Sequence, residues 1–197
     1  MDAAERTGIM PLPSAQIHQL AFYANGLTPV YEMELRGPEL LRLQKGPFYP
    51  DVQWDLDRMT GLGLLDLASV TYTRDGEGAW LTAAYRLSVH GRIASERAIA
   101  APRAQRTLHF LMEVVDAYAR IGLAEVRVRA IWEDPTYGDP ELVELALIDL
   151  ADPEQNATAW TAELFQSFTS SKIPLSPREK LHLYFHYLRR LSRGIEE

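Results

Sequence analysis

Apolar side chains recur every three or four residues along much of the chain, and this period predicts amphipathic helices. The first predicted helix begins at Ser14, a residue type that favours helix N-caps, and ends at Asn25-Gly26, which tolerate the left-handed conformation common at helix ends. A second helix is predicted from about Pro38 to Lys45. The third begins with Pro50-Asp51, which suits a helix N-terminus, and is closed by glycines at 61 and 63.

The spacing of apolar residues along the chain changes after the third helix. Residues 65–73 and 80–87 have the character of extended strands, and a glycine-bearing turn at 74–78 lies between them. A strand pair that follows three short helices has the outline of a winged helix. We therefore predict a winged-helix-like unit over residues 14–100, preceded by a flexible arm at residues 1–13.

Helical patterns dominate the second half. Residues 123–132 also fit a strand, because Val126, Val128 and Ala130 alternate with arginines, but a helix is favoured. The last helix has a capping box, Ser176-Pro177-Arg178-Glu179. The predicted fold class is mainly α with a small β-hairpin (α+β), with residues 101–197 as a helical extension packed on the winged-helix-like unit. The further helices are expected at 93–100, 107–121, 123–132, 141–147, 158–169 and 177–193.

Composition narrows the class of protein. With 197 residues, 47% of them hydrophobic, the chain can bury a core without metal or disulfide support. It has no cysteine, which excludes disulfides and thiolate metal sites and suits a reducing cytoplasm. No apolar run approaches the roughly 20 residues that span a bilayer, so no membrane association is expected. The formal net charge of −7 disfavours general binding to polyanions.

The sequence contains no complete motif of the common catalytic or nucleotide-binding sites. Gly61-Leu62-Gly63 is a fragment of a dinucleotide fingerprint, but Asp66 occupies the place of the third glycine and no βαβ unit follows. The chain has no P-loop lysine motif, no Gly-x-Ser-x-Gly elbow and no His-Glu-x-x-His motif. We therefore expect a protein that is not an enzyme and uses no cofactor.

Two groups of side chains could in principle hold a metal. His182 and His186 lie four residues apart and can share one face of a helix, but the arginines around them would repel a cation. They are expected to face solvent or a partner. An acidic segment could bind calcium or magnesium through oxygen ligands, yet its spacing fits a solvated surface loop better. The acidic residues concerned are Glu133, Asp134, Asp139 and Glu141.

Charge on the third helix bears on the choice of partner. A winged helix that reads DNA places this helix in the major groove, but here three aspartates accompany Arg58 and would repel phosphates. Trp54 suits protein contact better than a base edge. The last helix has a broad apolar face and a mixed one, which pack either on the chain's own core or on another subunit. The predicted partner-binding residues are Trp54, Asp55, Tyr184, Tyr187, Arg190 and Arg193.

Several short motifs resemble the Panacea family of bacterial antitoxins and phage-associated proteins. They cover residues 14 to about 145, whereas residues 150–197 have no counterpart and the lysine usual in the first-helix motif is missing. The similar segments are Gln19–Tyr23, Lys45–Pro50, Leu56–Leu64 and Tyr85–Arg92.

The resemblance implies a non-catalytic protein that binds and restrains, or delivers, a protein partner. More distantly, the pattern is similar to small winged-helix subunits that link ATPases to effectors in bacterial defence complexes. We therefore expect a protein partner such as a toxin, an effector or an ATPase subunit, with oligomer formation left open. The alternative is a DNA-binding winged-helix transcriptional regulator that uses the hairpin and the basic last helix.

Overall fold

The structure is a computed structural model that describes residues 1–33, 37, 39–75, 78–169 and 174–193. Its described part is mainly helical with two small antiparallel sheets, which confirms the predicted α+β class. The elements in chain order are α1 (Asp2–Arg6), β1 (Leu12–Pro13), α2 (Ser14–Leu27), the 3-10 helix η1 (Pro29–Tyr31), β2 (Glu39–Leu43), β3 (Gly46–Phe48), α3 (Pro50–Gly61), β4 (Leu65–Asp75), β5 (Gly78–Leu87), α4 (Val89–Ile99), α5 (Pro102–Ala119), α6 (Ala124–Trp132), β6 (Leu147–Asp149), α7 (Ala157–Phe168) and α8 (Pro177–Arg193).

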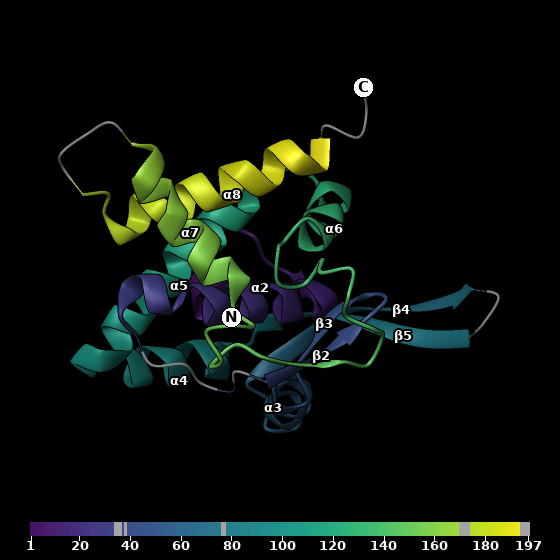
Figure 1. The fold of residues 1–197 in the computed structure, drawn as a ribbon. Coiled ribbons are helices and arrows are strands. Elements are labelled where there is room, and N and C mark those ends of the chain that lie inside the picture. Colours follow the sequence, from purple (N-terminus) through teal and green to yellow (C-terminus); the bar gives the residue numbers. More distant parts are fainter. Residues whose placement is uncertain (34–36, 38, 76–77, 170–173, 194–197) are drawn as a thin grey trace.

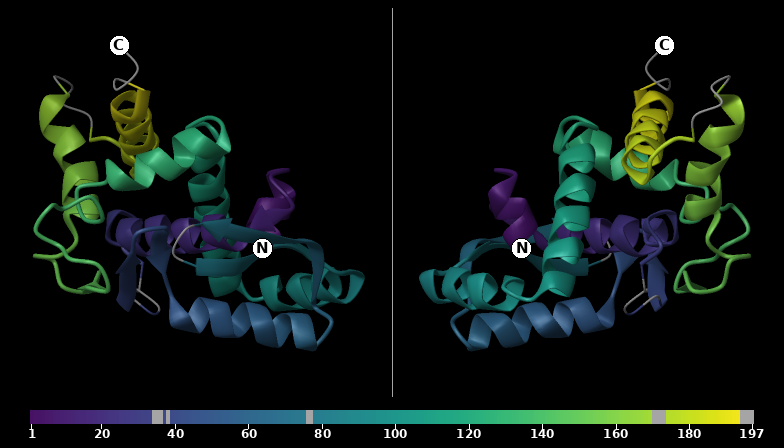
Figure 2. Two further views of the ribbon diagram at one scale, coloured as in Figure 1. Left: turned by 90° about the vertical axis from the view of Figure 1, so that its right-hand side faces the viewer. Right: turned by 90° about the vertical axis from the view of Figure 1, so that its left-hand side faces the viewer.

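Helix α2 crosses the centre of the molecule. Helices α7 and α8 lie on one side of it, and α3 with the sheets lies on the other (Figure 1). Phe22, Tyr23 and Leu27 of α2 are completely buried, as expected for apolar and aromatic side chains that contact several elements at once. Helix α5 contacts α2, α4 and α8 and so joins the two sides (Figure 2). One buried cluster therefore draws on both halves of the chain, while the proposed boundary near residue 100 stays a prediction.

Strands β4 and β5 form the hairpin that was predicted as a wing. Their pairing runs from Leu65↔Leu87 to Asp75↔Gly78, with a register shift between Leu67 and Ser69. Strand β1 pairs with β5 only at Leu12↔Tyr85 and Pro13↔Ala84, so the outer part of the hairpin projects away from the core (Figure 1). The predicted turn at 74–78 falls partly on residues 76–77, which lie outside the described residues.

The predicted second helix is wrong. Residues 39–43 form strand β2, which pairs with β3 through the turn at Gln44-Lys45 and with β6 on its other side. Gly46 has a φ of 123°, a conformation that only glycine adopts readily, and this allows the tight reversal into β3. Pairing with a segment about a hundred residues away thus overrides the local apolar pattern.

The predicted helix at 141–147 is also wrong, for a related reason. This segment runs beside β2, where Leu145 N–H donates to the carbonyl of Arg42 over 2.7 Å and Arg42 N–H donates to that of Ala146 over 2.9 Å. Residues 147–149 then form β6. The remaining predicted helices, including the ambiguous one at 123–132, are confirmed within a few residues.

The N-terminal residues do not form a loose arm. Asp2–Arg6 is the short helix α1, and the side chains of Ala3, Ala4 and Leu12 are buried in the main core. Strand β1 adds backbone hydrogen bonds to β5. Small apolar side chains therefore attach this segment to the core, whereas the sequence pattern predicted a flexible arm over residues 1–13.

A buried carboxylate connects the elements of the second half. Asp134 lies in the loop after α6 and is 1% exposed. It accepts hydrogen bonds from Thr136 N–H (2.8 Å), Tyr137 N–H (3.0 Å), the Thr158 hydroxyl of α7 (2.9 Å) and the Tyr184 hydroxyl of α8. The prediction of a solvated acidic loop is therefore wrong for Asp134, while Glu141 in the same segment is exposed. Burial of a charge is tolerated because donors surround it.

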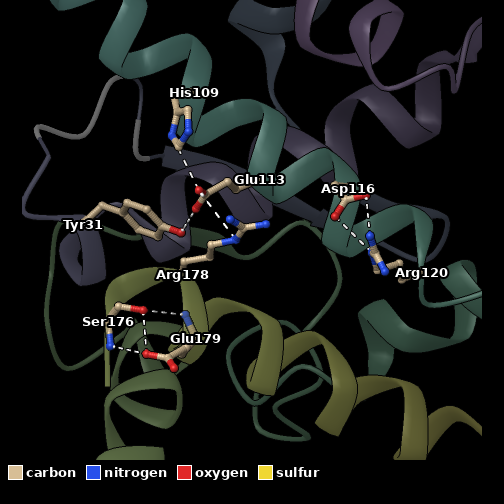
Figure 3. A network of polar contacts seen from close by, with 8 residues as sticks. All are labelled: Tyr31, His109, Glu113, Asp116, Arg120, Ser176, Arg178 and Glu179. Carbon is tan, nitrogen blue, oxygen red and sulfur yellow. Dashed lines mark hydrogen bonds and ion pairs between the residues drawn. The ribbon is translucent and has the colours of Figure 1, made fainter. Parts of the chain in front are cut away.

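The start of α8 has the predicted capping box. Glu179 accepts from Ser176 N–H over 2.8 Å and from the Ser176 hydroxyl over 2.7 Å, and Glu179 N–H donates to Ser176 Oγ over 3.3 Å (Figure 3). These bonds lower the pKa of the Glu179 carboxyl. Beside them, Glu113 of α5 accepts from the Tyr31 hydroxyl and lies 3.9 Å from Arg178 (Figure 3). The N-terminal end of α8 is thus attached to α5 and η1.

Truncation of Asp134 tests this connection. We expect Asp134→Ala to lower the free energy of unfolding by about 3–5 kcal/mol, because several buried donors would lose their acceptor. Asp139→Ala is a matched control in the same loop, where the carboxylate accepts from Glu141 N–H at an exposed position, and should cost about 1 kcal/mol or less. Urea unfolding of both variants gives the comparison, and equal losses would contradict the assignment.

The Tyr184 hydroxyl gives a pH-dependent test. Burial raises the pKa of the Asp134 carboxyl above its ordinary value of 3.8, and the Tyr184 hydroxyl acts in the opposite direction. Tyr184→Phe should therefore raise the pKa of Asp134 further. Because a raised pKa in the folded state costs stability once the carboxyl ionises, the destabilisation caused by Tyr184→Phe should grow as pH rises through the pKa of Asp134 and be smallest under acidic conditions. Urea titrations across this pH range measure the effect. Tyr187→Phe is the control, and a pH-independent difference would count against the prediction.

Candidate functional site

Helix α3 presents an acidic outer face. Leu56 is its buried anchor, while Asp51, Asp55 and Asp57 are exposed and Trp54 is 69% exposed. Proline at the first helical position and Asp51 in the first turn account for where the helix begins. Trp54 and Asp55, which were predicted to bind a partner, are both exposed, and their role in partner binding stays a prediction.

The N-terminus of α3 borders a cleft of about 500 Å³. Three carboxylates, those of Glu39, Asp51 and Asp55, belong to its lining, and none of the described lining residues is basic. Its apolar wall includes Leu41, Val52 and Leu147. This acidic cleft can accept a basic side chain together with the apolar carbons that carry it.

The hairpin has an apolar face with a buried base and an exposed outer part. Side chains alternate between the two faces of a strand, so Leu81, Ala83, Tyr85 and Leu87 share one face of β5. Tyr85 and Leu87 are buried against Leu56 of α3. Leu81, two residues beyond the partly buried Ala83, is 71% exposed.

Strand β4 extends this exposed surface. Tyr72 pairs with Leu81 and Val70 pairs with Ala83, so both lie on the same face, and they are 62% and 55% exposed. We call Val70, Tyr72 and Leu81 the apolar wing face. Contiguous apolar side chains on a projecting two-stranded ribbon are typical of a surface that another protein covers.

On the last helix, the structure departs from the predicted partner-binding role most clearly at Tyr184. Tyr184 is completely buried and bonded to Asp134, so it is not part of a surface in this structure. Tyr187 is partly buried and packs on Phe165, whereas Arg190 and Arg193 are exposed. Leu181, Phe185 and Leu188 are buried with Tyr184, which shows that the apolar face of α8 packs on the chain's own core.

The two histidines of α8 face a groove. Together with Arg120 and Arg189 they line a hollow between α5 and α8 with a volume of about 210 Å³. Sequence reasoning singled out His182 and His186 but not the arginine at the end of α5, because its position beside α8 depends on how the two helices pack. Within the described ranges, no group of three or more histidine, aspartate or glutamate side chains is placed to hold a metal ion.

Comparison with known proteins supplies no family. No protein-family model matches the chain, and no curated protein matches it either. In the described part of the chain, none of the helices combines the length and the apolar character needed to traverse a bilayer. The function must therefore be inferred from the acidic face of α3, the apolar wing face and the groove beside α8.

Proposed function

We propose that this chain is a non-catalytic protein-interaction subunit that acts in the cytoplasm. The observation that carries the proposal is the apolar wing face, where three large side chains are more than half exposed on one side of a projecting hairpin. Water contact with this much contiguous apolar surface is unfavourable, and a protein partner would remove it. The absence of cysteine fits the proposed compartment.

The charge of α3 narrows the chemistry of the partner. Asp51, Asp55 and Asp57 surround the exposed Trp54, and the acidic cleft lies at the same helix. We infer a partner surface that is apolar at its centre and carries lysine or arginine side chains around it, because complementary charge steers association and disfavours wrong partners. Aromatic side chains such as Trp54 often carry a large share of binding energy.

The resemblance of residues 14–145 to Panacea-type antitoxins supports a more specific form of the proposal. In that form the chain neutralises a toxin, or serves as an accessory subunit of a bacterial defence or toxin–antitoxin assembly. The toxin, effector or ATPase subunit would then be the partner whose basic side chains meet α3.

Copurification with matched variants tests the proposal. A tagged full-length chain in its own host should retain a stoichiometric partner, and Val70→Ser, Tyr72→Ser and Leu81→Ser combined should reduce the retained partner by about tenfold or more, because the apolar contact is lost. Leu123→Ser is the control, since Leu123 is 75% exposed elsewhere on the molecule. A wild-type chain that stays alone and monomeric would contradict the proposal.

The alternative function, a DNA-binding transcriptional regulator, rests on the arginines of α8. It requires the protein to neutralise phosphates, yet the helix that would enter the major groove presents Asp51, Asp55 and Asp57. We expect no saturable binding of duplex DNA at low salt, measured by fluorescence anisotropy. An affinity that falls steeply as salt increases would instead favour the regulator.

A further inference from the structure

The basic groove between α5 and α8 is a second surface with a charge opposite to that of α3. It is lined by Ala117 and Arg120 of the α5 end and by His182, Phe185, His186 and Arg189 of α8. Among the described lining residues, none is acidic. A hollow with two guanidinium groups, two imidazole N–H donors and no carboxylate in its described lining suits an anionic group.

The basic side chains of α8 form a stripe along this groove. His182, His186, Arg189 and Arg193 are spaced by four, three and four residues, which places them on one face of the helix. The stripe spans about 16 Å at the helical rise per residue. Its far end lies near Gly122, just after α5, where the Arg193 side chain comes close to the glycine.

The nearby carboxylates are already engaged. Glu113 contacts Tyr31, His109 and Arg178 toward the N-terminal end of α8 (Figure 3). Asp116 pairs with Arg120 on its own helix, with distances of 3.0 Å and 3.2 Å (Figure 3). The arginines farther along α8 thus add positive charge that these two carboxylates do not offset locally.

We propose that the basic groove binds an acidic segment of a partner protein, through glutamate or aspartate side chains that pair with Arg189 beside Arg120, whose guanidinium also contacts Asp116. Ala117 and Phe185 give the groove an apolar floor, which suits the methylene groups of such side chains. Arginine forks match carboxylates with two hydrogen bonds.

Nucleic acid fits this groove less well. The groove follows the end of α5 and the middle of α8, from His182 to Arg189, so neither helix N-terminus, with the N–H donors common in phosphate sites, is among its described lining residues. The net charge of −7 opposes a long polyanion, whereas a short acidic segment samples only the local charge.

Binding of a fluorescein-labelled deca-glutamate peptide to the full chain at low salt tests the proposal. We expect saturable binding that weakens about tenfold in Arg189→Glu, because a repulsive charge replaces an attractive one. Arg97→Glu is the matched control, since Arg97 is an exposed arginine in the last turn of α4 and the change in net charge is the same. It should alter the affinity by about twofold at most.

A second variant and a folding control complete the experiment. Arg120→Glu should reproduce the loss from the α5 side of the groove, and thermal unfolding of each variant checks that it folds. Equal effects of Arg189→Glu and Arg97→Glu would overturn the proposal, as would tighter binding of a short duplex DNA that Arg189→Glu abolishes. Because the probe is a peptide and not the copurified partner, this test stands apart from that of the apolar wing face.

Discussion

The carboxylate of Asp134 lies where the loop after α6, helix α7 and helix α8 meet. A buried carboxylate needs donors for its lone pairs, and here Thr158 and Tyr184 supply two of them from elements that are distant in sequence. The interaction therefore holds α7 and α8 against the loop after α6. It also sets the rotation of α8, because Tyr184 must point inward to reach Asp134.

The position of the basic stripe on α8 follows from that rotation. With Tyr184 inward, His182, His186, Arg189 and Arg193 lie along the groove with α5 or beside it. The acidic side chains of α3 and the apolar wing face belong to the other side of the core, where Leu56 and Tyr85 join the helix to the hairpin. A chain with a net charge of −7 thus separates negative and positive surfaces, and net charge alone hides this.

Much of the candidate site could be predicted from the local pattern of apolar and polar residues in the sequence. Trp54 and Asp55, two predicted partner-binding residues, are exposed because Val52, Leu56 and Met59 form the inner side of α3. Tyr184 was misassigned because an aromatic face on a terminal helix fits a core and a partner equally well. Arg120 was missed, since nothing in its own helix indicates that α8 packs beside it.

By itself, the sequence determined the helices with clear periodicity and defined ends, such as α3 and α8, and the hairpin, whose strands are close neighbours in the chain. These elements depend on interactions between residues a few positions apart. Only the tertiary structure decided that residues 39–43 form a strand, that residues 141–147 do not form a helix and that Asp134 is buried. Each of these depends on partners about twenty to a hundred residues away, and the free energy of such pairing exceeds weak local preferences for helix or loop.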